Sequence, residues 1–348
     1  MDDSQLTQDI SRLHGLIQSA PLPEDLRSKA EGMVERLSRL AKYGQYGQEF
    51  ETTQHYIDWI THLPWDKTTK DSLDISPIRQ ILDKNHYGLD ELKNRFLEYV
   101  SVLILNQKQK VDFHAPTLLL VGLVGTGKTT LAKSIAEALG RKFVRIPFGG
   151  MSSALDLRGL SRSHPEAEPG QIIKSLRRAE SRNPVILLDE IDRIAPSAHG
   201  EIMGVLVELL DPEQNMAFVD HFIDFPFDLS QALFIATANN STNISTAVMD
   251  RLEPILMPSY SDDEKLHIAR DYILHRQLQN ASLPAHALAI QENVWPKIIR
   301  PAGFDAGIRS VERTLEGVVR KVARLMVENK GQQFTVTEDN VKEFLPKY

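Results

Sequence analysis

The 348-residue sequence contains no cysteine, which excludes disulfide bonds, thiolate metal sites and a cysteine nucleophile. No apolar run approaches the roughly 18 residues that a membrane helix needs, so we expect no membrane segment. Residues 1–5 are acidic and are not followed by the apolar core of a secretion signal, which favours a cytoplasmic protein. The eleven histidines show no metal-ligand spacing and are read as ordinary surface or core residues.

The sequence also has fewer basic than acidic residues. Lysine and arginine number 40 against 47 aspartate and glutamate residues, which gives a net charge of −7. Proteins that bind nucleic acid through bulk charge are basic, so we expect no nucleic-acid partner. One basic cluster is better explained as the solvated face of a helix; it comprises Lys174, Arg177, Arg178 and Arg182.

The most informative segment that is present is a glycine-rich loop. It matches the pattern G-x-x-x-x-G-K-[ST], whose backbone N–H groups surround phosphates. It follows an apolar run at 117–121 and precedes a helical pattern at 131–139, which is the strand–loop–helix context that the pattern requires. The residues expected to bind the nucleotide here are Gly122, Leu123, Val124, Gly125, Thr126, Gly127, Lys128, Thr129 and Thr130.

A second segment supplies the acidic groups. The apolar run at 185–188 ends in Asp189 and Glu190. We expect Thr129 and Asp189 to hold Mg²⁺, because hydroxyl and carboxylate oxygens are ligands that this ion prefers. Lys128 would neutralise charge on the β- and γ-phosphates, and Glu190 would orient or deprotonate the attacking water. Together the two segments predict a nucleoside-triphosphate hydrolase.

The remaining pattern predicts an α/β fold. Strands are expected at 117–121, 143–147, 185–189 and 233–238, with a short apolar run at 255–257, and they alternate with helices. This order is typical of a parallel sheet with helices on both faces. The predicted domains are 1–72, a helical hairpin or connector, 73–258, a large α/β nucleotide-binding domain, and 259–348, a small helical lid with a strand pair near 334–336. The two helices of residues 5–42 either form an antiparallel hairpin or pack on the main core.

Four further positions fit such a site. Asn239 ends the strand at 233–238, where an amide is able to hold the water. Arg251 follows a helical turn and is placed to reach a neighbouring subunit's nucleotide, whereas Arg309 opens a lid helix and is placed to reach the γ-phosphate. His86, just before Tyr87 and Gly88, would line the base pocket. Each arginine, taken alone, is more often part of a surface ion pair, and His86, taken alone, is more often a surface histidine.

The order of these groups reproduces the working parts of AAA+ ATPases, and the chain resembles the ATPase module of the Lon ATP-dependent protease family over nearly its whole length. The resembling segments are 56–60, 63–65, 85–89, Gly149–Gly150, Arg158–Gly159, 187–192, Leu210-Asp-Pro-Glu-Gln-Asn215 and 249–253. The resemblance implies ATP and Mg²⁺ as cofactors. It also assigns His86, Tyr87 and Gly88 to the adenine, Asn239 to sensor 1, Arg251 to the arginine finger and Arg309 to sensor 2.

The same resemblance implies a homo-oligomer, a hexameric ring that pulls protein substrates through a central pore. Residues 342–348 fall where the family's Ser–Lys protease domain would begin, and the large amino-terminal lobe is not found, so we expect no peptidase site in this chain. The family's gripping loop usually reads Tyr-Ile-Gly, whereas the matching segment at 163–170 has His164-Pro165 beside the acids Glu166 and Glu168. Either the apolar grip is lost here or a neighbouring residue substitutes for it. Two functions therefore remain open: ATP-driven remodelling of proteins in quality control, or an assembly or adaptor ATPase that binds partners without threading them.

Overall fold

The computed structural model describes residues 3–41, 47–109, 117–300 and 307–346. The chain divides into two compact units. Unit 1 comprises Met1–Ser72, Gln109–Leu119 and Leu139–Pro254, and unit 2 comprises Leu73–Lys108, Leu120–Ala138 and Ile255–Tyr348. The predicted three-part division of the chain stays a prediction.

A five-stranded sheet has the strand order β2-β3-β6-β1-β7. Its strands are β1 (Thr117–Val121), β2 (Phe143–Pro147), β3 (Val185–Asp189), β6 (Leu233–Ala238) and β7 (Leu252–Leu256). The first four have the predicted bounds, whereas β7 begins at Leu252 rather than at residue 255. Strand β3 is fully buried and runs parallel to both β2 and β6. The sheet and its helices confirm the predicted α/β class.

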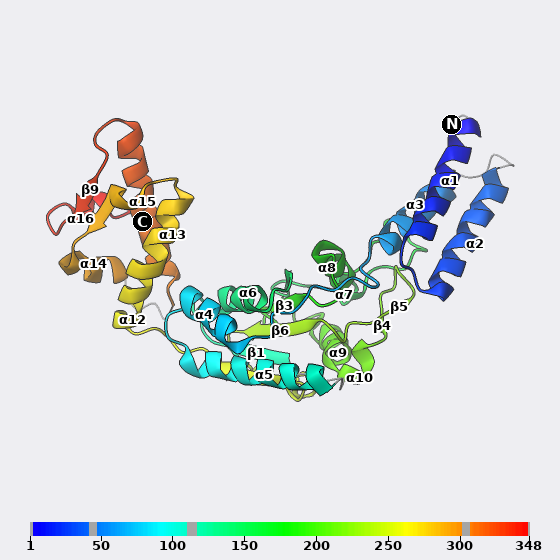
Figure 1. The fold of residues 1–348 in the computed structure, drawn as a ribbon, viewed down its shortest axis with the longest axis horizontal. Coiled ribbons are helices and arrows are strands. Elements are labelled where there is room, and N and C mark those ends of the chain that lie inside the picture. Colours follow the sequence, from blue (N-terminus) through cyan, green and yellow to red (C-terminus); the bar gives the residue numbers. More distant parts are fainter. Residues whose placement is uncertain (1–2, 42–46, 110–116, 301–306, 347–348) are drawn as a thin grey trace. The chain divides into compact units, whose positions relative to one another are not determined.

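The amino-terminal part of unit 1 is a group of three helices (Figure 1). They are α1 (Asp3–Ser19), α2 (Glu24–Ala41) and α3 (Gly47–Thr61). Helices α1 and α2 lie side by side and antiparallel, which is the predicted hairpin, and α3 packs on both. The Arg27 guanidinium donates to the carbonyls of Ile17 at 2.7 Å and Ala20 at 2.9 Å. Positive charge at the end of α1 is favourable because the last carbonyls of a helix lack partners within it.

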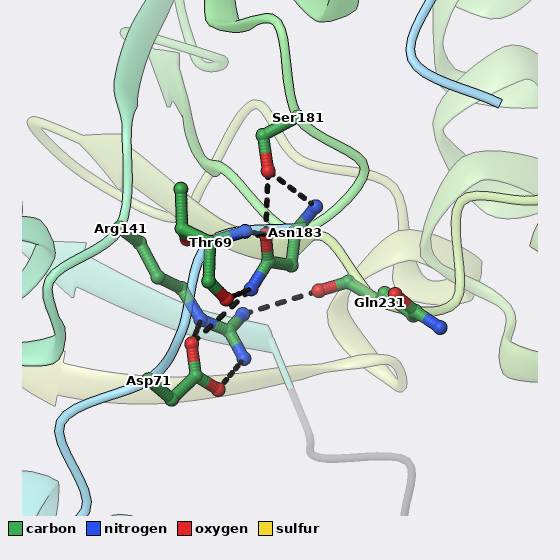
Figure 2. Close-up of polar contacts among 6 residues, drawn as sticks. All are labelled: Thr69, Asp71, Arg141, Ser181, Asn183 and Gln231. Carbon is green, nitrogen blue, oxygen red and sulfur yellow. Dashed lines mark hydrogen bonds and ion pairs between the residues drawn. The ribbon is translucent and has the colours of Figure 1, made fainter. Parts of the chain in front are cut away.

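The rest of unit 1 contains the strands β2, β3 and β6 and the segments that connect them. Its further elements are α7 (Leu155–Arg158), α8 (Gln171–Ala179), α9 (His199–Leu210), α10 (Pro212–Asn215), α11 (Thr246–Met249), β4 (Phe218–Val219) and β5 (Pro226–Phe227). Figure 2 shows Arg141, which precedes β2, donating to both carboxylate oxygens of Asp71. The amide of Asn183, which precedes β3, bonds the backbone of Thr69. These contacts fasten the segment after α3 to the amino ends of the strands.

Unit 2 is mostly helical. Its elements include α4 (Ile75–Asn85), α5 (Asp90–Gln109), α6 (Lys128–Leu139), α12 (Asp262–His267), a π-helix η1 (Ile268–Ile273), α13 (Leu274–Asn280), the 3-10 turns η2 (Ala285–Ala287) and η3 (Glu292–Val294), α14 (Trp295–Ile299), α15 (Arg309–Val327) and α16 (Val341–Phe344). Strand β8 (Leu288–Ile290) pairs in parallel with β9 (Phe334–Val336), the predicted small strand pair. Buried Trp295 packs in a core with Val311, Leu315 and Val318 of α15. That four–three spacing is the apolar stripe of an amphipathic helix.

Candidate active site

The glycine-rich loop of unit 2 connects β1 to α6, as predicted. Gly125 and Gly127 have φ of +88° and +94°, a region that side-chain-bearing residues rarely adopt. A Cβ at Gly122 would lie 2.7 Å from the carbonyl oxygen of Met257. The loop is therefore a backbone cradle that only glycine permits at these positions, and it ends at the amino terminus of a 12-residue helix. Such an end attracts phosphate through its N–H groups and its dipole.

Side chains hold the loop from within and from the segment just before α12. The Lys128 ammonium donates to the carbonyls of Gly122 at 2.5 Å and Leu123 at 3.0 Å. The buried Thr126 hydroxyl donates to the carbonyl of Leu123 at 2.9 Å. Tyr260, just before α12, donates its hydroxyl to the carbonyl of Thr126 at 2.9 Å. The loop thus has a fixed shape, with a cation folded over its carbonyl groups.

Arg309 lies beside this loop. The N–H of Ile308 donates to the carbonyl of Gly125 at 3.0 Å. A Cβ at Gly125 would lie 3.4 Å from Cγ of Arg309, and one at Gly307 would lie 2.6 Å from the carbonyl oxygen of Val124. The close approach of the two backbones brings the first residue of α15 to the glycine loop. This arrangement is compatible with the predicted sensor-2 role of Arg309, which remains a prediction.

His86 and Tyr87 face different neighbours. His86 ends α4 and is buried, with Nε2 2.9 Å from the hydroxyl of Ser134 in α6. Tyr87 stacks on His267 of α12 with ring centroids 5.0 Å apart. Gly88 has φ of +63°, so the chain turns sharply at the place assigned to the adenine. The structure supports a fixed turn here, and contact with a base remains a prediction.

Burial of His86 has a consequence for acid stability. Burial, together with the positive charge of Lys93, lowers the pKa of His86 from 6.5 to about 4. The folded protein therefore keeps this imidazole neutral, whereas the unfolded chain takes up a proton below about pH 6.5. Stability present above that pH should fall as pH decreases toward 4, by up to about 3 kcal/mol from this group.

His86→Gln should reduce this loss, because glutamine is able to bond Ser134 without titrating. The measurement is the free energy of unfolding in urea at pH 7 and pH 4.5 for both proteins. An equal loss of stability in wild type and variant would contradict the assignment.

The acidic end of β3 belongs to unit 1. Asp189 is buried, and its Oδ2 accepts from Nε and Nη2 of Arg145 at 2.7 and 2.6 Å. Its Oδ1 accepts from the hydroxyl of Thr237 at 2.5 Å. The same hydroxyl accepts from the N–H of Glu190 at 2.9 Å, and Glu190 has φ of +57°. Thr237 on β6 therefore fixes both predicted acids where the strand ends.

Two further predicted residues of unit 1 make defined contacts. The N–H of Asn239, just after β6, donates to Oδ2 of Asp192 at 3.1 Å. Arg251, after α11, donates from Nε and Nη2 to Oδ2 of Asp211 at 3.2 and 2.8 Å. Its Nη1 donates to the carbonyl of Ala247 at 2.8 Å. Thus the backbone N–H of Asn239 and the side chain of Arg251 each contact an acidic residue of the same unit.

Sequence reasoning missed several of these partners. Arg145, Thr237 and Tyr260 carry no motif, and nothing in their local sequence indicates that they fix Asp189 or the glycine loop. Asp211 lies in one of the segments that carry the family resemblance, but its sequence pattern predicts no role for it. All four act through contacts between residues distant in sequence, which local patterns do not reveal.

The chemistry of these residues suits a magnesium nucleotide. The loop is a phosphate cradle, because a side chain at Gly122 would collide with the backbone of Met257. Asp189 carries carboxylate oxygens and Thr129 a hydroxyl oxygen, which are donors of the kind that Mg²⁺ prefers, and a shared role in holding the ion remains a prediction. Among the described residues there is no group of three or more acidic, histidine or cysteine side chains fit to hold a metal.

No helix in the described part of the chain combines the length and apolar character needed to cross a bilayer.

Comparison with protein families gives two matches. Residues 118–260 match the ATPase family associated with various cellular activities (AAA), and residues 279–335 match the Lon protease AAA+ ATPase lid domain. The two matched regions contain the acidic strand end and the helices around Trp295, respectively. The glycine loop falls within the first.

Individual relatives agree with the family matches. The chain is 43% identical to Lon protease of Lawsonia intracellularis over 338 aligned residues. The aligned region covers 97% of this chain and 40% of that protein. It is 42% identical over 333 residues to Lon protease of Heliobacterium modesticaldum, covering 96% of this chain and 40% of the relative. Lon protease of Trichlorobacter lovleyi is 41% identical over 345 residues, with 99% and 41% covered. The chain thus spans about 40% of the length of these relatives, and it belongs to the AAA+ ATPases as a module of the Lon protease family.

Proposed function

We propose that this chain is a Mg²⁺-dependent ATPase module that couples ATP hydrolysis to the remodelling of protein substrates. The observation that carries the ATPase part is the glycine cradle at the start of α6, with Lys128 folded over it. The acidic end of β3 and the AAA family match add support. The direct test is ATP hydrolysis by the purified chain with Mg²⁺ and with EDTA, where turnover should require the ion.

In the proposed reaction, Lys128 binds the β- and γ-phosphate oxygens, while the loop N–H groups orient the chain of phosphates. Thr129 and Asp189 would hold Mg²⁺, which would neutralise charge on the phosphates. Glu190 accepts a proton from the attacking water, and Asn239 orients that water. Arg309 and Arg251 would stabilise negative charge in the transition state, the latter on a neighbouring subunit's nucleotide.

The finer parts of the proposal concern assembly and substrate. Relatives named Lon protease share more than 40% identity with nearly the whole chain. We therefore propose a homo-oligomeric, hexameric ring that acts on unfolded proteins in quality control. The peptidase activity that the relatives' name implies is not part of the proposal for these residues.

The predicted gripping loop is anchored at both sides of its tip. The backbone N–H of Leu160 donates to the backbone carbonyl of Glu168. The carboxylate of Glu168 lies 3.0 Å from Nε2 of His55 in α3. The guanidinium of Arg162 lies 4.0 Å from the centre of the Tyr56 ring. The tip, residues 163–166, is exposed. A fixed loop suits substrate contact, but a His-Pro-Glu tip offers little apolar area to grip arbitrary sequence.

The same observation favours the second function. A polar, proline-stiffened tip on a fixed base suits specific partner binding better than threading. An ATPase that binds partners without threading them is therefore the alternative. The two functions differ in whether unfolded protein accelerates ATP turnover.

Replacing His164-Pro165-Glu166 by Tyr-Ile-Gly should raise the stimulation of ATP turnover by unfolded casein. The reason is that an aromatic side chain packs on any sequence through large non-directional contact area. The measurement is ATP turnover with and without casein for both versions. Strong stimulation of the wild type that is lost in His164→Ala would show that the histidine grips well and would contradict this interpretation.

A further inference from the structure

The segment Leu210–Asn215 belongs neither to the glycine loop nor to the acidic end of β3, and its structure shows what Asp211 does. Asp211 lies between α9 and α10. Its Oδ1 accepts from the N–H groups of Glu213 at 3.0 Å and Gln214 at 3.3 Å, which caps α10. Its Oδ2 accepts only from Arg251 among the described residues. One carboxylate thus caps a helix with one oxygen and holds an arginine with the other.

The contacts of Arg251 account for three of its N–H groups. A guanidinium carries five N–H donors in a rigid plane. The Nε–H and one Nη2–H go to Asp211, and one Nη1–H goes to the carbonyl of Ala247 in α11. One N–H on each terminal nitrogen makes no further hydrogen bond to a described residue. Free N–H groups on the two terminal nitrogens are donors that a phosphate oxygen accepts from.

We infer that Asp211 is a positioning residue that holds the Arg251 guanidinium with its terminal N–H groups directed to a phosphate of a neighbouring subunit. This inference rests on the proposed role of Arg251 in ATP hydrolysis. An unanchored arginine samples many rotamers, and ordering it would cost entropy in every catalytic cycle. The contact with Asp211 removes that cost before the nucleotide is met.

The charge of Asp211 is part of this role. The hydrogen bond from Arg251 lowers the pKa of the Asp211 carboxyl, and the N–H groups of Glu213 and Gln214 lower it further. The group is therefore an anion at neutral pH. Pro212, the first residue of α10, fixes the backbone that follows Asp211 and so helps to aim the carboxylate.

The deciding variant is Asp211→Ser, with Asp211→Ala for comparison. Serine is a good helix cap, but its hydroxyl is too short to reach Arg251 and carries no charge. We expect Asp211→Ser to keep thermal stability near that of wild type and to lower kcat about 10–100-fold, since small misplacements of a catalytic group cost this much. KM for ATP should change little. Asp211→Ala should lower kcat similarly and also lower the melting temperature.

Asp211→Ser is then made in the Arg251→Ala background, in which there is no arginine side chain for Asp211 to hold. There Asp211→Ser should cause no further loss of kcat. An equal loss of kcat in both backgrounds, or a higher kcat in Asp211→Ser, would overturn the inference. Unchanged turnover in Arg251→Ala alone would instead refute the proposed role of Arg251, so the two failures are distinguishable.

Discussion

Glu190→Gln is expected to slow ATP hydrolysis by about 10²–10⁴-fold, the range that a general base contributes, while ATP binding persists. Glutamine keeps the size of glutamate and removes the charge that accepts a proton. Binding depends on the glycine loop and Lys128, which this substitution does not touch. The measurement is single-turnover hydrolysis alongside the affinity for a fluorescent ATP analogue.

The local structure supports this role for Glu190. Its φ of +57° is uncommon for a residue other than glycine and costs free energy. The hydroxyl of Thr237 holds this conformation by accepting from the N–H of Glu190 at 2.9 Å. A Cβ at Gly149 would lie 3.2 Å from Oε2 of Glu190, so the carboxylate passes close to the backbone there. A costly conformation that is held in place is typical of functional sites.

Two controls make the experiment decisive. Lys128→Ala should lose binding as well as turnover, because it removes the cation that meets the phosphates. Glu201→Gln makes the same chemical change as Glu190→Gln on an exposed face of α9 and should leave both properties unchanged. Hydrolysis at the wild-type rate in Glu190→Gln would remove Glu190 from the mechanism.

The strands were the most predictable part of the fold. Strands β1, β3 and β6 are continuous apolar runs with four or more consecutive buried residues, and such runs mark central parallel strands. The predicted start of β7 is too late because β7 is an edge strand in which only Leu252 and Ile255 are buried, and it contains Pro254. Proline is tolerated at a sheet edge, but in the sequence it reads as a strand terminator.

The candidate site was predictable in its backbone and its acids but not in its polar partners. A glycine loop between a strand and a helix is a local pattern, so its position followed from the sequence. The pairs Arg145–Asp189 and Arg251–Asp211 join residues 44 and 40 positions apart in the chain. Many arginines and aspartates are available for such pairs, and only the fold selects among them. The π-helix η1 likewise has no recognised sequence signal here.

Arg251→Ala should reduce ATP turnover about 10³-fold or more, the value of an arginine finger in phosphoryl transfer. A further expectation is that ATP turnover is lost in neighbouring wild-type subunits as well as in the variant subunits. If Arg251 acts on a neighbouring subunit's nucleotide, mixing variant with wild-type subunits should lower activity per wild-type subunit. Each variant subunit would deprive a neighbouring wild-type site of its arginine.

The mixing experiment needs a control that separates a shared site from simple dilution. Arg320→Ala removes an exposed arginine of α15 that pairs with Glu316 one turn away, so it should leave activity per wild-type subunit unchanged on mixing. Light scattering in the presence of ATP reports the assembly in the same samples. Full ATP turnover in a strictly monomeric sample would contradict a site shared between subunits. In that case the contact of Arg251 with Asp211 would be structural, because both residues belong to the same subunit and no neighbour would be needed.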